Sequence, residues 1–179
     1  MPFTFTPCAV SGLFEIQPAV FADNRGYFFE CYSKRDFEEA GITADFVQDN
    51  QSRSVKGVLR GLHYQITHPQ AKLVRAVYGE IFDVAVDVRR DSPSYGKWQG
   101  VILSAEKQNQ FFIAEGFAHG FLVLSDTAIF SYKCADFYYP DDEGGIAWDD
   151  PSIGIKWPDL GMDYILSEKD KKLSKICSG

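Results

Sequence analysis

The feature that most constrains the fold of this chain is a series of short runs rich in β-branched and aromatic residues, divided by turns containing Gly, Pro or Asp. Runs of this length suit strands and are too short for most helices. The strands expected from them cover residues 3–6, 13–16, 27–32, 45–48, 58–64, 72–78, 80–88, 98–103, 110–114, 121–124 and 128–137. Many short strands separated by such turns indicate an all-β sandwich or barrel.

Helices have a small place in this pattern. Ser33 is the expected N-cap of one short helix, and Gly41 lies past its end. Ser167 opens a second, with Asp170 at the third helical position. Residues 116–120, a segment bracketed by glycines, are predicted to form a turn. No βαβ alternation, GxGxxG motif or P-loop is present, which argues against a dinucleotide-binding fold.

Composition limits the classes of function. At 179 residues, with 45% hydrophobic and 15% aromatic residues, the chain is expected to form one ordered domain over residues 1–179. A formal charge of −7 argues against a nucleic-acid binder, because no basic excess is available to neutralise phosphates. A small anionic ligand stays open, since a few Arg and Lys can form a local positive pocket.

The cellular setting is inferred from the cysteines and from missing signals. Cys8, Cys31, Cys134 and Cys177 show no CxxC spacing, which indicates reduced thiols in a cytoplasmic protein. We find no signal-peptide pattern and no apolar run long enough to span a membrane.

The stretch QDNQSRSVKGVLRGLHYQ, residues 48–65, threads polar and basic side chains through strand-like runs. In a regular strand, alternation would place Arg60 and His63 on opposite faces. Gly61, between them, would change this if it introduced a kink or bulge. A surface strand has no need of a Gly at this point, so this stretch is a candidate for the floor of a site.

Three histidines could take part in chemistry. His68 precedes a proline in a polar loop and is expected to be exposed. His63 and His119 lie beside glycines, and each taken alone is more often a hydrogen-bonded core or rim residue than a catalyst. A metal site is the other alternative, because jelly rolls often bind a metal at the mouth. The position two after His63 is Gln65, a poor ligand, which favours a metal-free site.

Other candidate residues have plain structural explanations. Tyr132 shares a strand face with Phe130, so packing with one hydrogen bond would explain it. Asp170 fits a helix-capping role. Lys72 opens a strand and would by default be solvated.

Taken together, these segments resemble the dTDP-4-dehydrorhamnose 3,5-epimerase family. The resemblance rests on the runs FADNRGYFFECY, FVQDNQSRSVKGVLRGLHYQ, QAKLVRAVYGEIFDVAVDVRRDSPSYGKW, AEGFAHGFLVLSD and YKCADFYYPDDEGGIAWDDPSIGIKWP, in the family's order. It implies a cupin-type jelly roll, a double-sheet β-barrel with a few short peripheral helices. It also implies a homodimer, no metal or other cofactor, and a thymidine-diphosphate 4-keto-6-deoxyhexose as substrate.

The resemblance also implies catalytic roles. His63 would be the base that removes a proton next to the ketone, and Asp170 would pair with it. Lys72 would lie near the ketone oxygen, and Tyr132 would return a proton from the opposite face. Such a step needs a base, an acid and a stabilised enolate oxygen.

Binding roles follow from the same resemblance. Arg25 and Arg60 would hold the diphosphate through charge-assisted hydrogen bonds. Tyr138 would stack on thymine. The remaining polar residues would contact the nucleoside, sugar or diphosphate: Glu30, Gln48, Asp49, Asn50, His119, Glu143 and Lys169. For Glu143 and Lys169 the alternative is that they are solvated charges.

Three functions remain open at this point. The first is the double epimerase implied by the resemblance. The second is an epimerase that inverts one carbon of a related nucleotide-linked 4-keto sugar, and deuterium incorporation at a single position would identify it. The third is a non-catalytic jelly roll that binds sugar nucleotides, which would bind tightly without taking up solvent deuterium.

Overall fold

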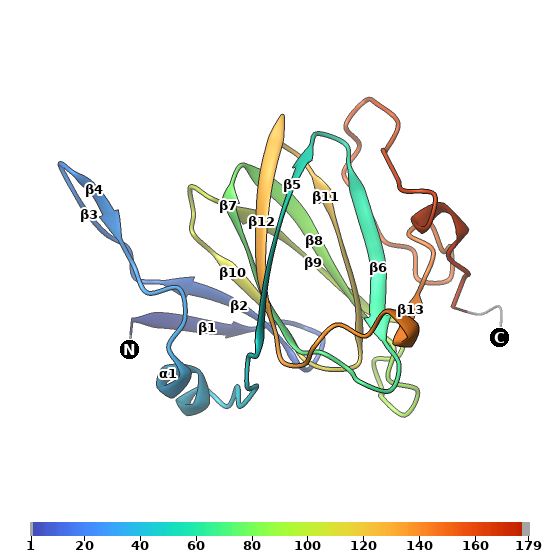
Figure 1. Ribbon diagram of the computed structural model, residues 1–179, viewed down its shortest axis with the longest axis horizontal. Coiled ribbons are helices and arrows are strands. Elements are labelled where there is room, and N and C mark those ends of the chain that lie inside the picture. The colour runs from blue at the N-terminus through green and yellow to red at the C-terminus, as the bar shows by residue number, and fades with distance from the viewer. Residues whose placement is uncertain (1, 177–179) are drawn as a thin grey trace.

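The computed structural model describes residues 2–176 and consists mainly of strands in two facing sheets (Figure 1). The larger sheet has the order β1 (Phe3–Pro7), β2 (Leu13–Pro18), β10 (Gln110–Ile113), β7 (Lys72–Tyr78), β12 (Thr127–Cys134) and β5 (Gln48–Val55). The smaller has the order β13 (Glu143–Gly145), β6 (Leu59–Gln65), β11 (Phe117–Val123), β8 (Glu80–Asp87) and β9 (Trp98–Ser104). Neighbouring strands pair antiparallel. The expected all-β double-sheet fold is confirmed, but the two sheets stay separate and do not close into a barrel.

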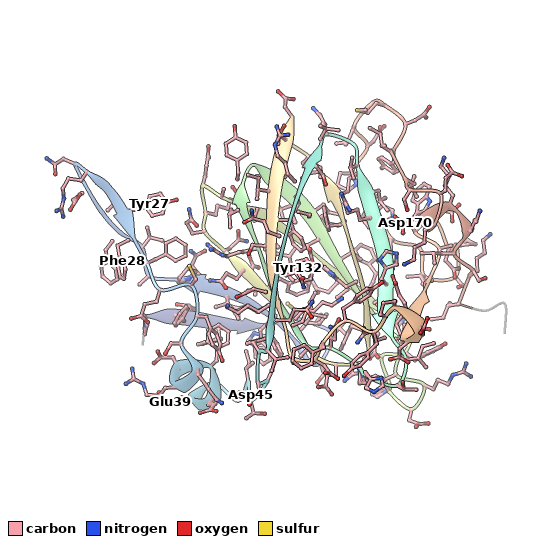
Figure 2. The ribbon with its side chains drawn as sticks, viewed as in Figure 1. Tyr27, Phe28, Glu39, Asp45, Tyr132 and Asp170 are labelled. Atoms are coloured by element: carbon pink, nitrogen blue, oxygen red, sulfur yellow. The ribbon has the colours of Figure 1, made fainter. Side chains whose placement is uncertain are left out.

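Several short elements lie outside the sheets. The hairpin β3 (Phe21–Asp23) and β4 (Gly26–Phe28) projects away from the body of the molecule (Figure 1), and the side chain of Phe28 points away from the sheets (Figure 2). The hydroxyl of Tyr27 accepts a hydrogen bond from the side chain of Gln108, in the turn between β9 and β10, at 3.0 Å. Helix α1 (Lys34–Glu39) follows the hairpin, with Ser33 at the N-cap as expected. Two 3₁₀ helices, η1 (Pro140–Asp142) and η2 (Asp170–Lys172), lie in the C-terminal third.

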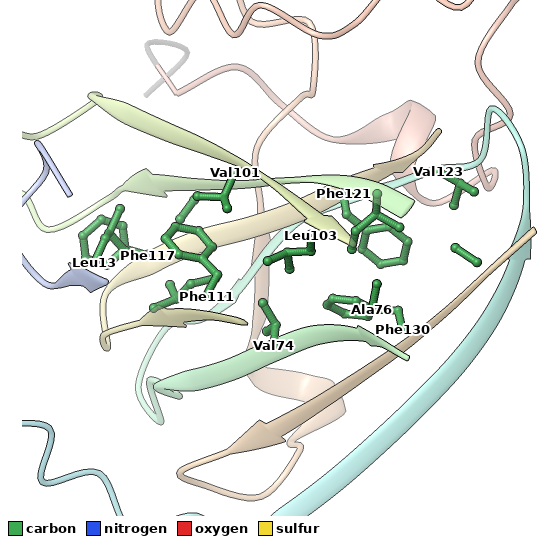
Figure 3. Close-up of a cluster of buried hydrophobic side chains, with 14 of the residues drawn as sticks. Leu13, Val74, Ala76, Val101, Leu103, Phe111, Phe117, Phe121, Val123 and Phe130 are labelled. Atoms are coloured by element: carbon green, nitrogen blue, oxygen red, sulfur yellow. The ribbon is translucent and has the colours of Figure 1, made fainter. Parts of the chain in front are cut away.

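The main core fills the space between the sheets (Figure 3). It includes Val74 and Phe111 from the larger sheet and Leu103 and Phe121 from the smaller one. Phe111 is fully buried, and truncating a buried Phe to Ala typically costs about 3–5 kcal/mol. A second cluster, around Phe37 of α1, covers part of the outer face of the larger sheet. Hydrophobic burial therefore stabilises the sandwich both between the two sheets and on the outer face of the larger sheet.

Three sequence-based expectations were wrong in detail. The segment 116–120 is not a turn, because β11 runs through it as a central strand. The glycine at position 120 is explained by close approach between strands rather than by a turn, because a Cβ there would lie 2.5 Å from the backbone oxygen of Arg60. The strand expected at 27–32 ends at Phe28, and the strand expected at 45–48 instead begins at Gln48 and continues to Val55. The second difference lies in a polar segment, where alternation gives a weak signal, whereas residues 27–32 are rich in aromatic residues that do not continue the strand beyond Phe28.

No helix among residues 2–176 is long and apolar enough to cross a membrane. Cys8, Cys31 and Cys134 are free thiols, and Cys177 lies outside the described residues.

Candidate active site

A cavity of about 560 Å³ opens between the two sheets. Arg60 and His63 reach it from β6 in the smaller sheet, whereas Lys72 and Tyr132 reach it from β7 and β12 in the larger sheet. A second cavity, of about 240 Å³, shares His63, Lys72 and Tyr132 with the first. The imidazole of His63 and the phenol of Tyr132 therefore enter the same space from opposite walls.

The irregular backbone at Gly61 brings Arg60 and His63 into one cavity. Gly61 has φ +108°, and the pairing of β11 with β6 shifts register between His119 and Phe121. The sequence-based condition, that Gly61 would have to distort the strand, is therefore met. A Cβ at Gly61 would lie 2.6 Å from the backbone oxygen of His119, so no other residue fits without movement of the backbone.

His63 pairs with the carboxylate of Asp170, a residue of the C-terminal segment that lies 107 positions later in the sequence. Nε2 of His63 lies 2.6 Å from Oδ1 of Asp170. Because an ionised carboxylate only accepts, Nε2 carries the hydrogen, and Nδ1 is the free basic nitrogen of the neutral ring. Burial lowers the pKa of His63, and the charges of Asp170 and Glu143 oppose this effect. The ring is thus held neutral and ready to accept a proton.

The backbone N–H of Asp170 donates to Oγ of Ser167 at 3.0 Å, as expected from the sequence, although the helix η2 begins only at Asp170 and has Lys169, not Ser167, at its N-cap. The carboxylate of Asp170 is free for His63 because this contact uses only the backbone of Asp170. One residue therefore makes both the expected contact with Ser167 and the pair with His63.

A second histidine–carboxylate pair lies beside the first. His119 is the cross-strand neighbour of His63, and its Nε2 lies 3.0 and 2.9 Å from the two carboxylate oxygens of Asp83. Asp83 is fully buried, and burial raises its pKa against the opposing effect of His119. The sequence analysis missed Asp83. An aspartate within the apolar run of β8 was the available signal, because a buried carboxylate needs a partner.

Lys72 and Tyr132 differ from their default descriptions. Lys72 is partly buried rather than a solvated strand-end lysine, and burial lowers its pKa. Burial raises the pKa of Tyr132, with a further contribution from Cys134. Tyr132 also packs against Phe130, with ring centroids 5.2 Å apart. A protonated phenol and an amine in a confined space can respectively donate a proton and stabilise an oxyanion.

The second cavity is lined by polar side chains from β5, from β13 and from the segment that follows β12. Tyr138 donates its hydroxyl to Oε2 of Glu143 at 2.8 Å, and its backbone N–H donates to Oε1 of Gln48 at 3.2 Å. Gln48 in turn donates to the Oδ1 of Asn50 at 3.1 Å. These four side chains line the same cavity, so three of the residues expected to contact the nucleoside (Gln48, Asn50 and Tyr138) lie together, beside Glu143.

Three of the expected site residues lie outside both cavities. Asp49 points to the other face of β5, where it pairs with Lys133 at 2.7 Å. Arg25 is 85% exposed at the tip of the β3–β4 hairpin and pairs with Asp23 at 2.6 Å. Glu30 is exposed just beyond β4. These residues contribute nothing to the two cavities of their own chain.

Gln65 and His68 have structural contacts. The Gln65 side chain donates to the backbone oxygens of His68 and Phe137 and accepts from the backbone of Tyr139. His68 is exposed as expected, and it stacks on Tyr139 at 4.2 Å. Within residues 2–176, no group of three or more His, Cys, Asp or Glu side chains is arranged to hold a metal ion.

Comparison with known proteins assigns the chain to a family. The family model of dTDP-4-dehydrorhamnose 3,5-epimerase matches residues 7–177. The enzyme of that name from Methanothermobacter thermautotrophicus is 55% identical over 170 residues, covering 94% of this chain and 92% of the relative.

Solved structures agree with this assignment. The crystal structure of the 3,5-epimerase RmlC from Legionella pneumophila in complex with dTDP-4-keto-L-rhamnose has a TM-score of 0.94 and 50% identity, covering 97% of this chain and 92% of that one. A 3'-monoepimerase, ChmJ from Streptomyces bikiniensis, is more distant, with a TM-score of 0.89 and 34% identity over 94% of this chain and 86% of that one. The two sheets thus have the cupin-like jelly-roll arrangement of these epimerases, and the chain belongs to the dTDP-4-dehydrorhamnose 3,5-epimerase family.

Proposed function

We propose that this protein is an isomerase that converts dTDP-4-dehydro-6-deoxy-D-glucose to dTDP-4-dehydro-L-rhamnose, a step in the formation of dTDP-L-rhamnose. The observation that carries the proposal is the placement of His63 and Tyr132 in one cavity on opposite walls. Inversion at carbon requires a proton to leave one face of the sugar and another to arrive on the other. An imidazole and a phenol that face each other across a ring meet this requirement.

His63 removes the proton next to the ketone through Nδ1, and Asp170 fixes the ring orientation and stabilises the imidazolium. The electrons of the broken C–H bond pass to the ketone oxygen, where the Lys72 ammonium stabilises the negative charge. Tyr132 then donates its proton to the same carbon from the other side. Once His63 has lost its proton to water and Tyr132 has taken one from water, repetition at the second carbon next to the ketone completes the double epimerisation.

The diphosphate and nucleoside are held by the polar lining. Arg60 is fixed by two contacts with Oγ of Ser54, at 3.3 and 3.2 Å, and its guanidinium can face a phosphate. The second cavity would take the nucleoside, with Tyr138 stacking on thymine and Gln48 and Asn50 offering hydrogen bonds. His119, Lys169 and Glu143 would line the sugar or diphosphate end.

The unit of function is a homodimer of single-domain chains, each using residues 1–179. Arg25 and Glu30 lie too far out to serve their own site, but the projecting hairpin could carry them to the cavity of a second copy (Figure 1). Phe21, Tyr27 and Phe28 are largely exposed on this hairpin, which supports an interface there.

We place the protein in the cytoplasm. The free thiols of Cys8, Cys31 and Cys134 support a reducing compartment.

A single-carbon epimerase is the second candidate, because ChmJ shares the fold. The identity to the 3,5-epimerases from M. thermautotrophicus (55%) and L. pneumophila (50%) is higher than that to ChmJ (34%), which favours the double reaction. A non-catalytic sugar-nucleotide binder is the third, and under that reading the convergence of His63, Lys72 and Tyr132 has no explanation.

One experiment separates the three functions. The protein is incubated with dTDP-4-dehydro-6-deoxy-D-glucose in deuterated water, and NMR follows the two carbons that flank the ketone. Deuterium and inversion at both carbons are expected. Incorporation at one carbon would indicate the mono-epimerase, and binding without incorporation would indicate the binding protein.

A further inference from the structure

The imidazole of His63 lies between two carboxylates. Oδ1 of Asp170 lies 2.6 Å from Nε2 of His63. Oε1 of Glu143 lies 3.7 Å from Nδ1, the nitrogen that is free to react. Glu143 comes from β13, which pairs with β6 so that Gly145 is opposite His63. The sheet itself therefore fixes the approach of this second carboxylate to the basic nitrogen.

The other oxygen of Glu143 is firmly held. Oε2 accepts from Nζ of Lys169 at 2.5 Å and from the Tyr138 hydroxyl at 2.8 Å, while the Glu143 side chain is only 13% exposed. Burial alone would raise the pKa of Glu143, but these hydrogen bonds outweigh it and lower the pKa. Lys169 and Tyr138 are themselves largely exposed. Glu143 thus presents an ionised Oε1 to His63 and connects through Oε2 to the surface.

The double reaction requires a route by which a proton can leave His63. After the first inversion His63 carries the proton taken from carbon, and it cannot act as a base again until that proton leaves. Asp170 occupies the other ring nitrogen and is almost completely buried, so it offers no direct route to water.

We propose that Glu143 is the proton exit of the catalytic base, resetting His63 between the two inversions. This inference rests on the proposed function and adds a role to the substrate contact that the family resemblance implies. The proton passes from Nδ1 of His63 to Oε1 of Glu143, directly or through one water, and then to bulk water. No electrons are exchanged, and each step breaks one N–H or O–H bond and forms another. The low pKa of Glu143 lets it release the proton quickly rather than store it.

The test compares Glu143→Gln with Asp141→Asn. Asp141 lies two positions away on η1 and is exposed, so its substitution makes the same change in charge on the same segment. Each protein reacts with saturating substrate in deuterated water, and NMR measures the fraction of product that is released after one inversion. For Glu143→Gln we expect this fraction to rise by at least about tenfold, whereas Asp141→Asn matches the wild type. Added formate, a small proton acceptor, is expected to restore part of the double inversion to Glu143→Ala.

A second measurement works without substrate. The charged and titratable groups around His63 are Asp170, Glu143, Lys169 and the neighbouring His119, together with Arg60, Lys72 and Tyr132, which line the same cavity. Removing the Glu143 charge should therefore lower the pKa of the His63 ring, by about 0.5–1 pH unit in an NMR titration, with no shift in Asp141→Asn.

Two results would overturn the inference: a wild-type partition between single and double inversion in Glu143→Gln, or, if that variant does not turn over, an unshifted His63 titration. Failure of the proposed function would look different, because the wild-type protein itself would then exchange at one carbon or at none.

Discussion

The two histidine–aspartate pairs of this site have neighbouring histidines but differ in exposure and in the origin of the aspartate. His63 and His119 are cross-strand partners on β6 and β11. His63 is 30% exposed and meets an aspartate 107 residues away, whereas His119 is 8% exposed and meets one from the adjacent strand β8. The first pair depends on the docking of the C-terminal segment, and the second is built into the sheet.

This difference separates a reacting group from a supporting one. Asp170 binds one ring nitrogen of His63 and leaves Nδ1 facing other groups, so the ring can exchange a proton. Both carboxylate oxygens of Asp83 lie within hydrogen-bond distance of Nε2 of His119, in the protein interior. Such a buried pair is costly to break but has little freedom to act as a base. We therefore expect substitutions in the first pair to affect the rate and those in the second to affect stability.

Replacement of His63 by Asn should have the largest effect. Loss of the base should lower kcat by about 10²–10⁴-fold, the usual contribution of general acid–base catalysis. The affinity for dTDP, measured by calorimetry, should stay nearly unchanged, because under the proposed function Tyr138, Gln48 and Asn50 hold the nucleoside rather than His63. Equal losses of affinity and rate would mean that His63 positions the substrate rather than reacts with it.

Asp170→Asn tests the orientation of the base. The amide can no longer favour the tautomer with hydrogen on Nε2, so kcat should fall by about 10²-fold or more with a small change in melting temperature. Steady-state kinetics and thermal unfolding of the same sample measure both. A large loss of stability at unchanged kcat would reverse the assignment of the two pairs.

Asp83→Asn should give the opposite pattern. Removing the charge from a fully buried pair is expected to lower the free energy of unfolding by roughly 3 kcal/mol. Urea denaturation measures this, and kcat of the folded fraction should fall less than in Asp170→Asn. A stable but inactive Asp83→Asn variant would place His119 in the chemistry.

Gly61→Ala affects both pairs, because Gly61 lies against the backbone of His119 and two positions before His63. The positive φ and the lack of space for a Cβ should together cost about 1–3 kcal/mol. Gly57→Ala, also at positive φ but against the end of the Met162 side chain, serves as a control outside this contact. A larger fall in activity for Gly57→Ala would argue against the bulge as the feature that places His63.

The pH dependence should show the smallest effect. Burial lowers the pKa of His63 below its ordinary value of 6.5, and the base works only when neutral. The value of kcat/KM should therefore fall as the pH decreases through a midpoint below 6.5, and be insensitive to pH just above it. A midpoint above 6.5 would mean that the two carboxylates dominate over burial.

The sequence predicted the strands well where apolar residues alternate or run together, as in β7 and β8. It failed at Gly116–Gly120, because a glycine needed for close approach between strands looks the same as one needed for a turn. The site could be predicted only in pieces. Arg60 and His63 lie in one informative stretch, and Gly61 signals that both can face one cavity.

The remaining contacts join segments far apart in the chain, and nothing local encodes them. Asp170 satisfies a helix cap in the sequence, so its pairing with His63 was implied by family resemblance alone. Asp83 is a charged residue in the middle of an apolar strand, which indicates that it has a partner but does not say which residue the partner is. The position of Arg25 depends on where the β3–β4 hairpin points, which the strand pattern does not determine.

In the proposed mechanism, His63 takes a proton from one face of the sugar and Tyr132 returns one to the other. The most direct test is Tyr132→Phe with substrate in deuterated water, with NMR following deuterium and configuration at each carbon. Because the base is intact and the acid is absent, we predict that deuterium enters with the original configuration retained and that inversion is almost lost. Inversion at a rate near that of the wild type would contradict the account.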